Sequence, residues 1–441
     1  MRSDSAPASG SSTMANAVAP TPARQGGDAA HRAGHPRRRS VGGMAIRTAP
    51  ARERAPVRRW LLLTAVVLVA VNLRGPIAAV SPVLLDLRSA LGLSAGAASL
   101  LTSVPVLCFS IAAPAATLLA ARTGPERAIS IGLAGIGLGT LVRSIDGAQA
   151  VLAGTVVIGV AITVGNVLVP VVIKRDFADR IGSVTGLYTA ALAGGAALTA
   201  ALTAPIADVA GWRLALGVWA VLAVAAWFAW TAALPVRTRA VPRRGSGRAR
   251  DVWRHPTAWV LALFLGCQST LYYAMTAWLP TILVDTASTS TATGGAAMSL
   301  FQLTGIATTL VVPPLATRLA GQRGLALLVA VLWVVSLSGL LLAPGGWPLW
   351  SVIAGLAQGA GISLAFTLVI LRAHRTESVA ALSGLAQGAG YAMGASGPLV
   401  MGLLLDATGG WSAPLLTLLG LAAVLGAAGI AAGRAGVHVD G

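Results

Sequence analysis

Long apolar runs separated by short polar segments make up most of the chain. The first six runs lie near residues 60–84, 95–121, 127–144, 148–173, 183–207 and 212–235. Six more follow near residues 255–284, 294–317, 324–343, 347–371, 378–405 and 411–433. Each is close to the ~20 apolar residues that a helix needs to cross a bilayer. The pattern predicts an all-α integral membrane protein with twelve transmembrane helices in two six-helix halves.

Polar segments divide the chain into five parts. Residues 1–59 are rich in Ala, Gly, Pro, Ser and Arg, and they predict a disordered cytoplasmic tail rather than a signal peptide. Residues 60–235 and 255–433 are expected to form the N-terminal and C-terminal halves. Residues 236–254 are expected to be a cytoplasmic linker, and residues 434–441 a cytoplasmic tail. The candidate start residues are Met1, Met14 and Met44.

Composition supports a membrane protein and changes the meaning of the net charge. The chain is 56% hydrophobic and 10% charged, and its mean hydropathy is +0.77. These values exclude an ordinary soluble protein. A net charge of +18 would indicate nucleic-acid binding in a soluble protein. In a membrane protein, the placement of the charges decides what they mean.

The basic residues alternate between the two sides that the helix count predicts. Seventeen lie in segments expected to face the cytoplasm, against three in segments expected outside. This asymmetry is the positive-inside pattern. It places both termini in the cytoplasm, locates the protein in the plasma membrane, expected to be a bacterial inner membrane, and excludes nucleic acid as a partner. Candidate gating residues at the inner ends are Arg122, Arg127, Lys174, Arg175, Asp176, Arg318 and Arg323. For Lys174 and Arg175, a topology anchor is the first interpretation and an inner gate is the alternative.

The two halves share an internal repeat of about 200 residues. Gly186, Asp208 and Trp212 recur as Gly384, Asp406 and Trp411, at offsets of 198, 198 and 199. The pair Arg122 and Arg127 recurs at an offset of 196. Two such halves, related by an axis along the membrane normal, would enclose a solute site near the bilayer midplane.

The strongest candidate for that site is Arg74, inside the first apolar run. An arginine within a membrane helix costs on the order of 2.5–3.5 kcal/mol on insertion scales, so it indicates function. Its planar guanidinium suits carboxylate-like and other planar anions. The following Gly75-Pro76 predicts a broken helix of the kind that lines cavities. Snorkelling, or a structural pair with Asp86, is the alternative.

Other polar residues inside the predicted spans are weaker candidates for solute binding. Each has interhelical packing as its alternative role. Pairs of Gln and Tyr four residues apart share a helix face and would offer hydrogen-bond donors beside an aromatic wall. Asn72 is expected mainly to satisfy backbone groups at the helix break. The candidates are Asn72, Asn166, Gln268, Tyr272, Gln358, Gln387 and Tyr391.

The order of several short motifs resembles the major facilitator superfamily over residues 60–433. The loop Ala121-Arg122-Thr123-Gly124 keeps the Arg and Gly of the superfamily's loop motif, but Ala121 replaces its Asp. Within that superfamily, the chain resembles the cyanate and 2-nitroimidazole transporter family. The stretches that carry this resemblance include Asn72-Leu73-Arg74, Ala277-Trp278-Leu279-Pro280 and Asp406-Ala407-Thr408-Gly409-Gly410-Trp411. The resemblance implies a carrier of a cyanate-like anion or a nitroimidazole-like ring.

The sequence thus predicts a monomeric secondary transporter of a small anionic or polar planar solute, working by alternating access. Every acid lies at a span end, in a loop or in a tail, so a coupled proton would travel with the solute or through an end acid such as Asp86. A broad drug-efflux carrier is the first alternative, and a membrane sensor or enzyme is the remote one. No catalytic constellation, cofactor motif or metal-ligand spacing is present in the sequence.

Overall fold

The structure is a computed structural model that describes residues 56–233, 249–373, 376–434, 436 and 439. Arg54–Gly441 forms one compact unit. Nearly all of the predicted N-terminal tail and most of the predicted linker lie outside the described residues. Within the described ranges the regular structure consists of helices alone.

The N-terminal half begins with a helix that ends close to Arg74. Its helices, in chain order, are α1 (Pro56–Ala78), η1 (Ser81–Val83), α2 (Leu84–Leu91), α3 (Ala95–Ile111), α4 (Ala113–Thr123), α5 (Pro125–Arg143), α6 (Ala148–Asp176), η2 (Ala178–Arg180), α7 (Ile181–Gly217) and α8 (Ala220–Ala233).

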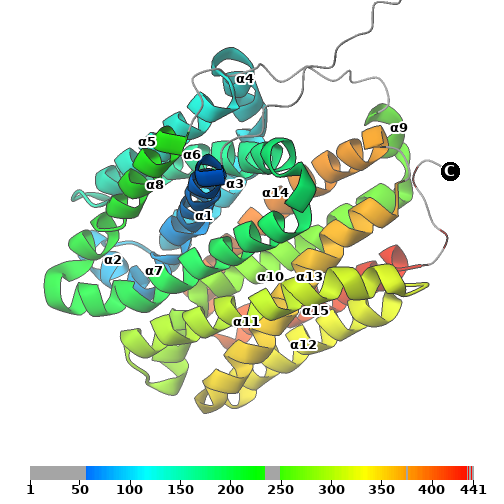
Figure 1. Cartoon of the computed structure of the whole chain (residues 1–441). Coiled ribbons are helices and arrows are strands. Elements are labelled where there is room, and N and C mark those ends of the chain that lie inside the picture. The colour runs from blue at the N-terminus through cyan, green and yellow to red at the C-terminus, as the bar shows by residue number, and fades with distance from the viewer. Residues whose placement is uncertain (1–55, 234–248, 374–375, 435, 437–438, 440–441) are drawn as a thin grey trace, which may run out of the picture. The chain divides into compact units, whose positions relative to one another are not determined.

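The C-terminal half is likewise built from helices that follow one another along the chain. Its helices are α9 (Ala249–Arg254), α10 (Pro256–Ala287), α11 (Thr291–Arg318), α12 (Arg323–Leu342), η3 (Pro344–Gly346), α13 (Trp347–Leu371), α14 (Thr376–Thr408) and α15 (Ser412–Ala432). Figure 1 shows α10, α13 and α14 running beside one another, and α10 packs against both of the others.

The described helices agree with the predicted membrane spans, although one predicted run is bent. Nine are long and apolar enough to cross a membrane, or ten when the bent pair α3 and α4 counts as one span. That pair bends by 58° within the predicted 95–121 run. One of the nine, Ser183–Ala233, covers two predicted runs, and Gly211 interrupts it with φ 77°. These counts are consistent with twelve crossings.

Local sequence explains where several helices begin. Ser94 and Ser290 precede α3 and α11, and their hydroxyls accept hydrogen bonds from the amides of Ala97 and Thr293. A serine in this position satisfies an amide that has no partner in the first turn of the helix. Between α4 and α5, Gly124 adopts φ 85°, a conformation that is strained for other residues.

The two halves meet through α3 with α14 and through α7 with α11. Glycines allow close approach at these contacts. A Cβ on Gly295 would lie 2.4 Å from the carbonyl oxygen of Ala200, and one on Gly402 would lie 2.6 Å from that of Ala95. One turn beyond Gly402, the Asp406 carboxylate accepts hydrogen bonds from the first amides of α3. At this end of the interface, the two halves are therefore in direct contact, through close backbone approach and through the Asp406 carboxylate.

Candidate functional site

The last turns of α1 carry Arg74 and are held by neighbouring helices. The carbonyl of Gly75 accepts a 3.0 Å hydrogen bond from the Thr199 hydroxyl on α7. A Cβ on Gly195 would lie 2.3 Å from the carbonyl oxygen of Val71, so α7 lies directly against α1. Pro76 lies inside α1, which ends two residues later at Ala78. The site is thus built at the end of a helix rather than in its middle.

The guanidinium of Arg74 lies over two tyrosine rings from the opposite half. Its carbon is 4.9 Å from the ring centroid of Tyr272 and 5.6 Å from that of Tyr273. The Tyr272 ring stacks on Phe301 at 5.9 Å, and its hydroxyl accepts a 3.0 Å hydrogen bond from Gln302. Cations are attracted to aromatic ring faces at these distances. Arg74 therefore links the N-terminal half to α10, whose Tyr272 ring is held in a defined orientation.

All four tyrosines of the chain lie within electrostatic range of this one arginine. Tyr188 and Tyr391 also lie close enough to interact electrostatically with Arg74. Tyr391 makes an edge-to-face contact with Phe109 at 5.8 Å. Since the chain has only four tyrosines, this concentration is not explained by composition.

Arg74 forms no ion pair with any residue that the structure describes. Asp86, the alternative partner, is exposed. The Arg74 side chain is only half-buried, so it is not sealed inside the protein. A cation surrounded by aromatic rings and without a carboxylate favours a small planar anion, because the guanidinium fork and the ring faces are both planar.

The two asparagines of the prediction have different surroundings. Asn72 is buried and donates to the carbonyls of Leu68 and Leu222, at 2.8 and 3.1 Å, so it ties α1 to α8. The side chain of Asn166 on α6 is half-buried and has no hydrogen-bond partner among the described residues. Its neighbour Gly165 packs against Leu73, beside Arg74.

The glutamines are divided between the C-terminal core and the interface. The side chain of Gln268 is buried. It donates to the backbone carbonyl of Gln358 at 3.1 Å and accepts from the indole of Trp333 at 3.1 Å. These bonds therefore join α10, α12 and α13 to one another. Gln387 is half-buried on α14 and bonds Ser383 at 2.7 Å, one turn before Tyr391. Gln302, through its bond to Tyr272, is the glutamine that directly supports the arginine site.

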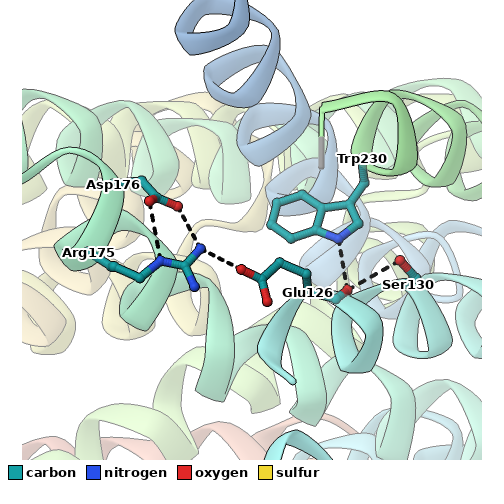
Figure 2. Close-up of polar contacts among 5 residues, drawn as sticks. All are labelled: Glu126, Ser130, Arg175, Asp176 and Trp230. Atoms are coloured by element: carbon teal, nitrogen blue, oxygen red, sulfur yellow. Dashed lines mark hydrogen bonds and ion pairs between the residues drawn. The ribbon is translucent and has the colours of Figure 1, made fainter. Parts of the chain in front are cut away.

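A charged cluster lies at the first turn of α5, and Figure 2 shows the contacts among its residues. Arg175 lies 2.6 Å from the carboxylate of Glu126 and 2.8 Å from that of Asp176. The backbone carbonyl of Glu126 accepts hydrogen bonds from the Trp230 indole at 3.0 Å and the Ser130 hydroxyl at 3.2 Å. The Glu126 side chain is only 3% exposed. This cluster joins α5, α6 and α8 at one end of the N-terminal half.

The C-terminal half holds a counterpart in which the acid is replaced by an amide. Arg372 donates to the Gln322 side chain at 2.6 Å and to the Ala432 carbonyl at 2.9 Å. Burial lowers the pKa of the Arg372 guanidinium. Gln322 follows Glu126 by 196 positions and Arg372 follows Arg175 by 197, in register with the repeat. Glu126 was not among the predicted candidate residues, although the repeat offset relates it to Gln322.

The remaining predicted loop residues do not join these clusters. Their side chains are exposed, and the described part of the chain shows no ion pair for any of them: Arg122, Arg127, Lys174, Arg318 and Arg323.

Comparison with known proteins agrees with this architecture. Residues 60–395 match the sequence model of the Major Facilitator Superfamily. The chain belongs to that superfamily. It is a multi-pass membrane protein and a secondary transporter, and the prediction that it is not an enzyme is confirmed.

Named relatives in this superfamily are matched over nearly their full length. The chain is 37% identical to transporter YycB of Bacillus subtilis (strain 168), over 86% of this chain and 94% of that one. It is 36% identical to the 2-nitroimidazole transporter of Escherichia coli (strain K12), over 85% and 96% of the two chains. It is 30% identical to the cyanate transport protein CynX of Escherichia coli (strain K12), over 82% and 95%. The predicted resemblance to the cyanate and 2-nitroimidazole transporters is thus confirmed.

A solved structure shows the same fold at low sequence identity. A mutant form of the nucleoside transporter NupG superposes with a TM-score of 0.71 at 12% identity, over 85% of this chain and 100% of that one. The predicted fold class is confirmed, whereas the solute is decided by side chains that such a distant relative does not share.

Proposed function

We propose that this transporter moves a small anionic or polar planar solute, cyanate-like or nitroimidazole-like, by alternating access around Arg74. It is proposed to act as a monomer in the bacterial inner membrane, with both termini cytoplasmic. The observation that carries the proposal is the Arg74 guanidinium over Tyr272 and Tyr273, without a carboxylate partner among the described residues. Because these residues come from opposite halves, a solute bound there would contact both halves at once.

The relatives support the solute class. The names of two relatives refer to cyanate, a small linear anion, and to a nitroimidazole, a small planar ring. A small anion would replace its hydrogen bonds to water with hydrogen bonds from the Arg74 guanidinium. A flat heteroaromatic ring would stack against the tyrosine rings. A broad drug-efflux carrier would instead require a buried acid to bind cationic compounds, and no carboxylate lies beside Arg74 in the described part of the site.

Uptake into proteoliposomes tests the proposal. Labelled cyanate and labelled 2-nitroimidazole are supplied separately, with and without a pH gradient. The wild type is compared with Arg74→Ala and with a control, Arg213→Ala, which removes an exposed arginine paired with Asp146. We expect Arg74→Ala to lose about tenfold or more of the uptake, since hydrogen bonds to charged groups contribute about 1.5–3 kcal/mol. Arg213→Ala should transport normally.

Each alternative result has a defined meaning. Equal uptake by Arg74→Ala would make Arg74 structural and end the site proposal. No uptake of either solute by the wild type would remove the proposed solute class, and transport of a lipophilic cation would favour drug efflux. Dependence on the pH gradient would show whether protons are the coupling ion.

A further inference from the structure

A second arginine, Arg143, is buried with no acidic partner among the described residues. It is the last residue of α5 and is 1% exposed. Its Nη1 donates a 2.7 Å hydrogen bond to the carbonyl of Pro76. Its Nε and Nη2 have no hydrogen-bond partner, and no ion pair involves it within the described ranges. Arginine is almost never fully buried unless it is paired, so this one needs an explanation.

The end of α1 supplies the missing negative charge. The last four carbonyls of a helix have no partner inside the helix, and together they carry partial negative charge. The Val80 amide, which would reach Pro76 in a continuing helix, instead bonds Ile77 at 3.4 Å. The carbonyl of Pro76 is thus open to the Arg143 guanidinium. Arg143 therefore caps the C-terminus of α1 from another helix.

The capped carbonyl lies two residues beyond Arg74. The preceding carbonyl, that of Gly75, is bonded by Thr199 of α7, and Asn72 is bonded to Leu222 of α8. Together with Arg143 of α5, three helices therefore hold this short stretch of α1. An apolar side chain of similar length would fill the same space but would leave the Pro76 carbonyl without its donor.

We propose that Arg143 is a positioning residue for the solute site: by capping α1 at Pro76, it holds the backbone that directs Arg74 toward the tyrosines of α10. This inference rests on the proposed function, in which Arg74 contacts the solute. Arg143 itself does not contact the solute. It acts on transport through Arg74.

The first test reads the position of residue 74 directly and needs no solute. Arg74→Cys is made in a chain whose two free cysteines are replaced, as Cys108→Ser and Cys267→Ser. A charged methanethiosulfonate reagent then labels the new thiol. We expect Arg143→Met to change the labelling rate about tenfold, the equivalent of ~1.4 kcal/mol, and Arg143→Lys, which keeps a charged donor, to change it little.

The matched control is Thr140→Val on the same helix. Thr140 is fully buried and its hydroxyl bonds only within α5, at 2.7 Å to Ile136. Loss of this hydroxyl removes a hydrogen bond within α5 and none to α1, so the labelling rate should stay at the parent value. If Arg143→Met is not recovered as folded protein, Arg143→Gln replaces it, because glutamine is too short to reach the same carbonyl.

The second test is transport with Arg74 restored. Arg143→Met should raise the half-saturation concentration for cyanate uptake about tenfold, again ~1.4 kcal/mol, with Arg143→Lys restoring most of the affinity. An unchanged labelling rate in Arg143→Met, or an equal change in Thr140→Val, would overturn the positioning role. A changed labelling rate in a protein whose wild type moves neither proposed solute would leave that role standing and reject the proposed function.

Discussion

Asp406 on α14 accepts a 2.7 Å hydrogen bond from the backbone amide of Gly96 at the start of α3. The other carboxylate oxygen accepts from the Ala95 amide at 2.9 Å. An anion at a helix N-terminus satisfies amides that lack partners and interacts favourably with the helix dipole. Because α3 and α14 belong to different halves, these two bonds must break for this end of the transporter to open.

Asp406→Asn should therefore favour the state that is open at this end. Asparagine has only one acceptor oxygen for the two amides, so one hydrogen bond to a charged group, worth about 1.5–3 kcal/mol, is lost, and we expect the open population to rise about tenfold to 150-fold. The distance between spin labels at the exposed residues Ser89 and Thr408 reports the opening. Asp285→Asn is the control, since Asp285 bonds Trp411 within the C-terminal half. Equal label distances in both variants would contradict the role of Asp406 in keeping this end of the transporter closed.

The adjacent glycines 194 and 195 should respond oppositely to alanine. A Cβ on Gly195 would lie 2.3 Å from the Val71 carbonyl oxygen, whereas one on Gly194 meets no atom within 4 Å. Gly195→Ala should destabilise the protein by about 1–3 kcal/mol, because α7 must move away from α1. Gly194→Ala should be neutral or stabilise by about 0.5–1 kcal/mol through helix propensity. Thermal unfolding in detergent measures both, and similar melting temperatures would refute the close approach of α1 and α7.

The two neighbouring tyrosines of α10 should differ in how much their hydroxyls matter. The Tyr272 hydroxyl is bonded to Gln302, which is 1% exposed. Tyr272→Phe leaves that amide without its partner, at a cost of about 1–3 kcal/mol. The Tyr273 hydroxyl is buried and has no partner in the described structure, so Tyr273→Phe should be neutral or slightly stabilising. Thermal unfolding compares the pair, and a larger loss for Tyr273→Phe would show that its hydroxyl has a partner, such as water.

The charged cluster at Glu126 should tolerate an amide, because the opposite half already uses one. Glu126→Gln reproduces the arrangement of Gln322 with Arg372. It should change stability by less than about 1 kcal/mol, whereas Glu126→Ala should lose about 1–3 kcal/mol by leaving Arg175 with fewer partners. Melting temperatures of the two variants measure the difference. A loss in Glu126→Gln as large as in Glu126→Ala would mean that the negative charge itself is required.

Much of the fold could be predicted because the apolar bilayer requires each spanning helix to be an apolar segment of suitable length. A run of about 20 apolar residues is a spanning helix wherever it occurs, so the runs agree with the helices despite the bend between α3 and α4. The break at Gly211 in α7 falls between the predicted runs 183–207 and 212–235, as expected. The 58° bend inside the predicted 95–121 run was not expected, because a bend within an apolar stretch depends on neighbouring helices, which apolar periodicity does not reveal.

The candidate site was only partly visible in the sequence. Arg74 stood out because a charge inside an apolar run is costly. The roles of Thr199, Gln302 and Arg143 were not visible, because each depends on a contact with a helix distant in the chain. Gln268 was predicted to bind solute, but its side chain forms hydrogen bonds to neighbouring helices within the C-terminal core.

The sequence by itself determined the fold class, the spans, the repeat and the arginine, because hydrophobicity, charge and spacing are properties of short segments. The tertiary structure alone decided that the rings of Tyr272 and Tyr273 lie against Arg74, that Asp406 caps α3, and that Arg143 caps α1. The partners in the Arg143 cap are 67 positions apart in the sequence, and those in the Asp406 cap are 310 positions apart. Both caps exist only when helices from different parts of the chain pack, since side chains are brought together by helix faces and not by their order along the chain.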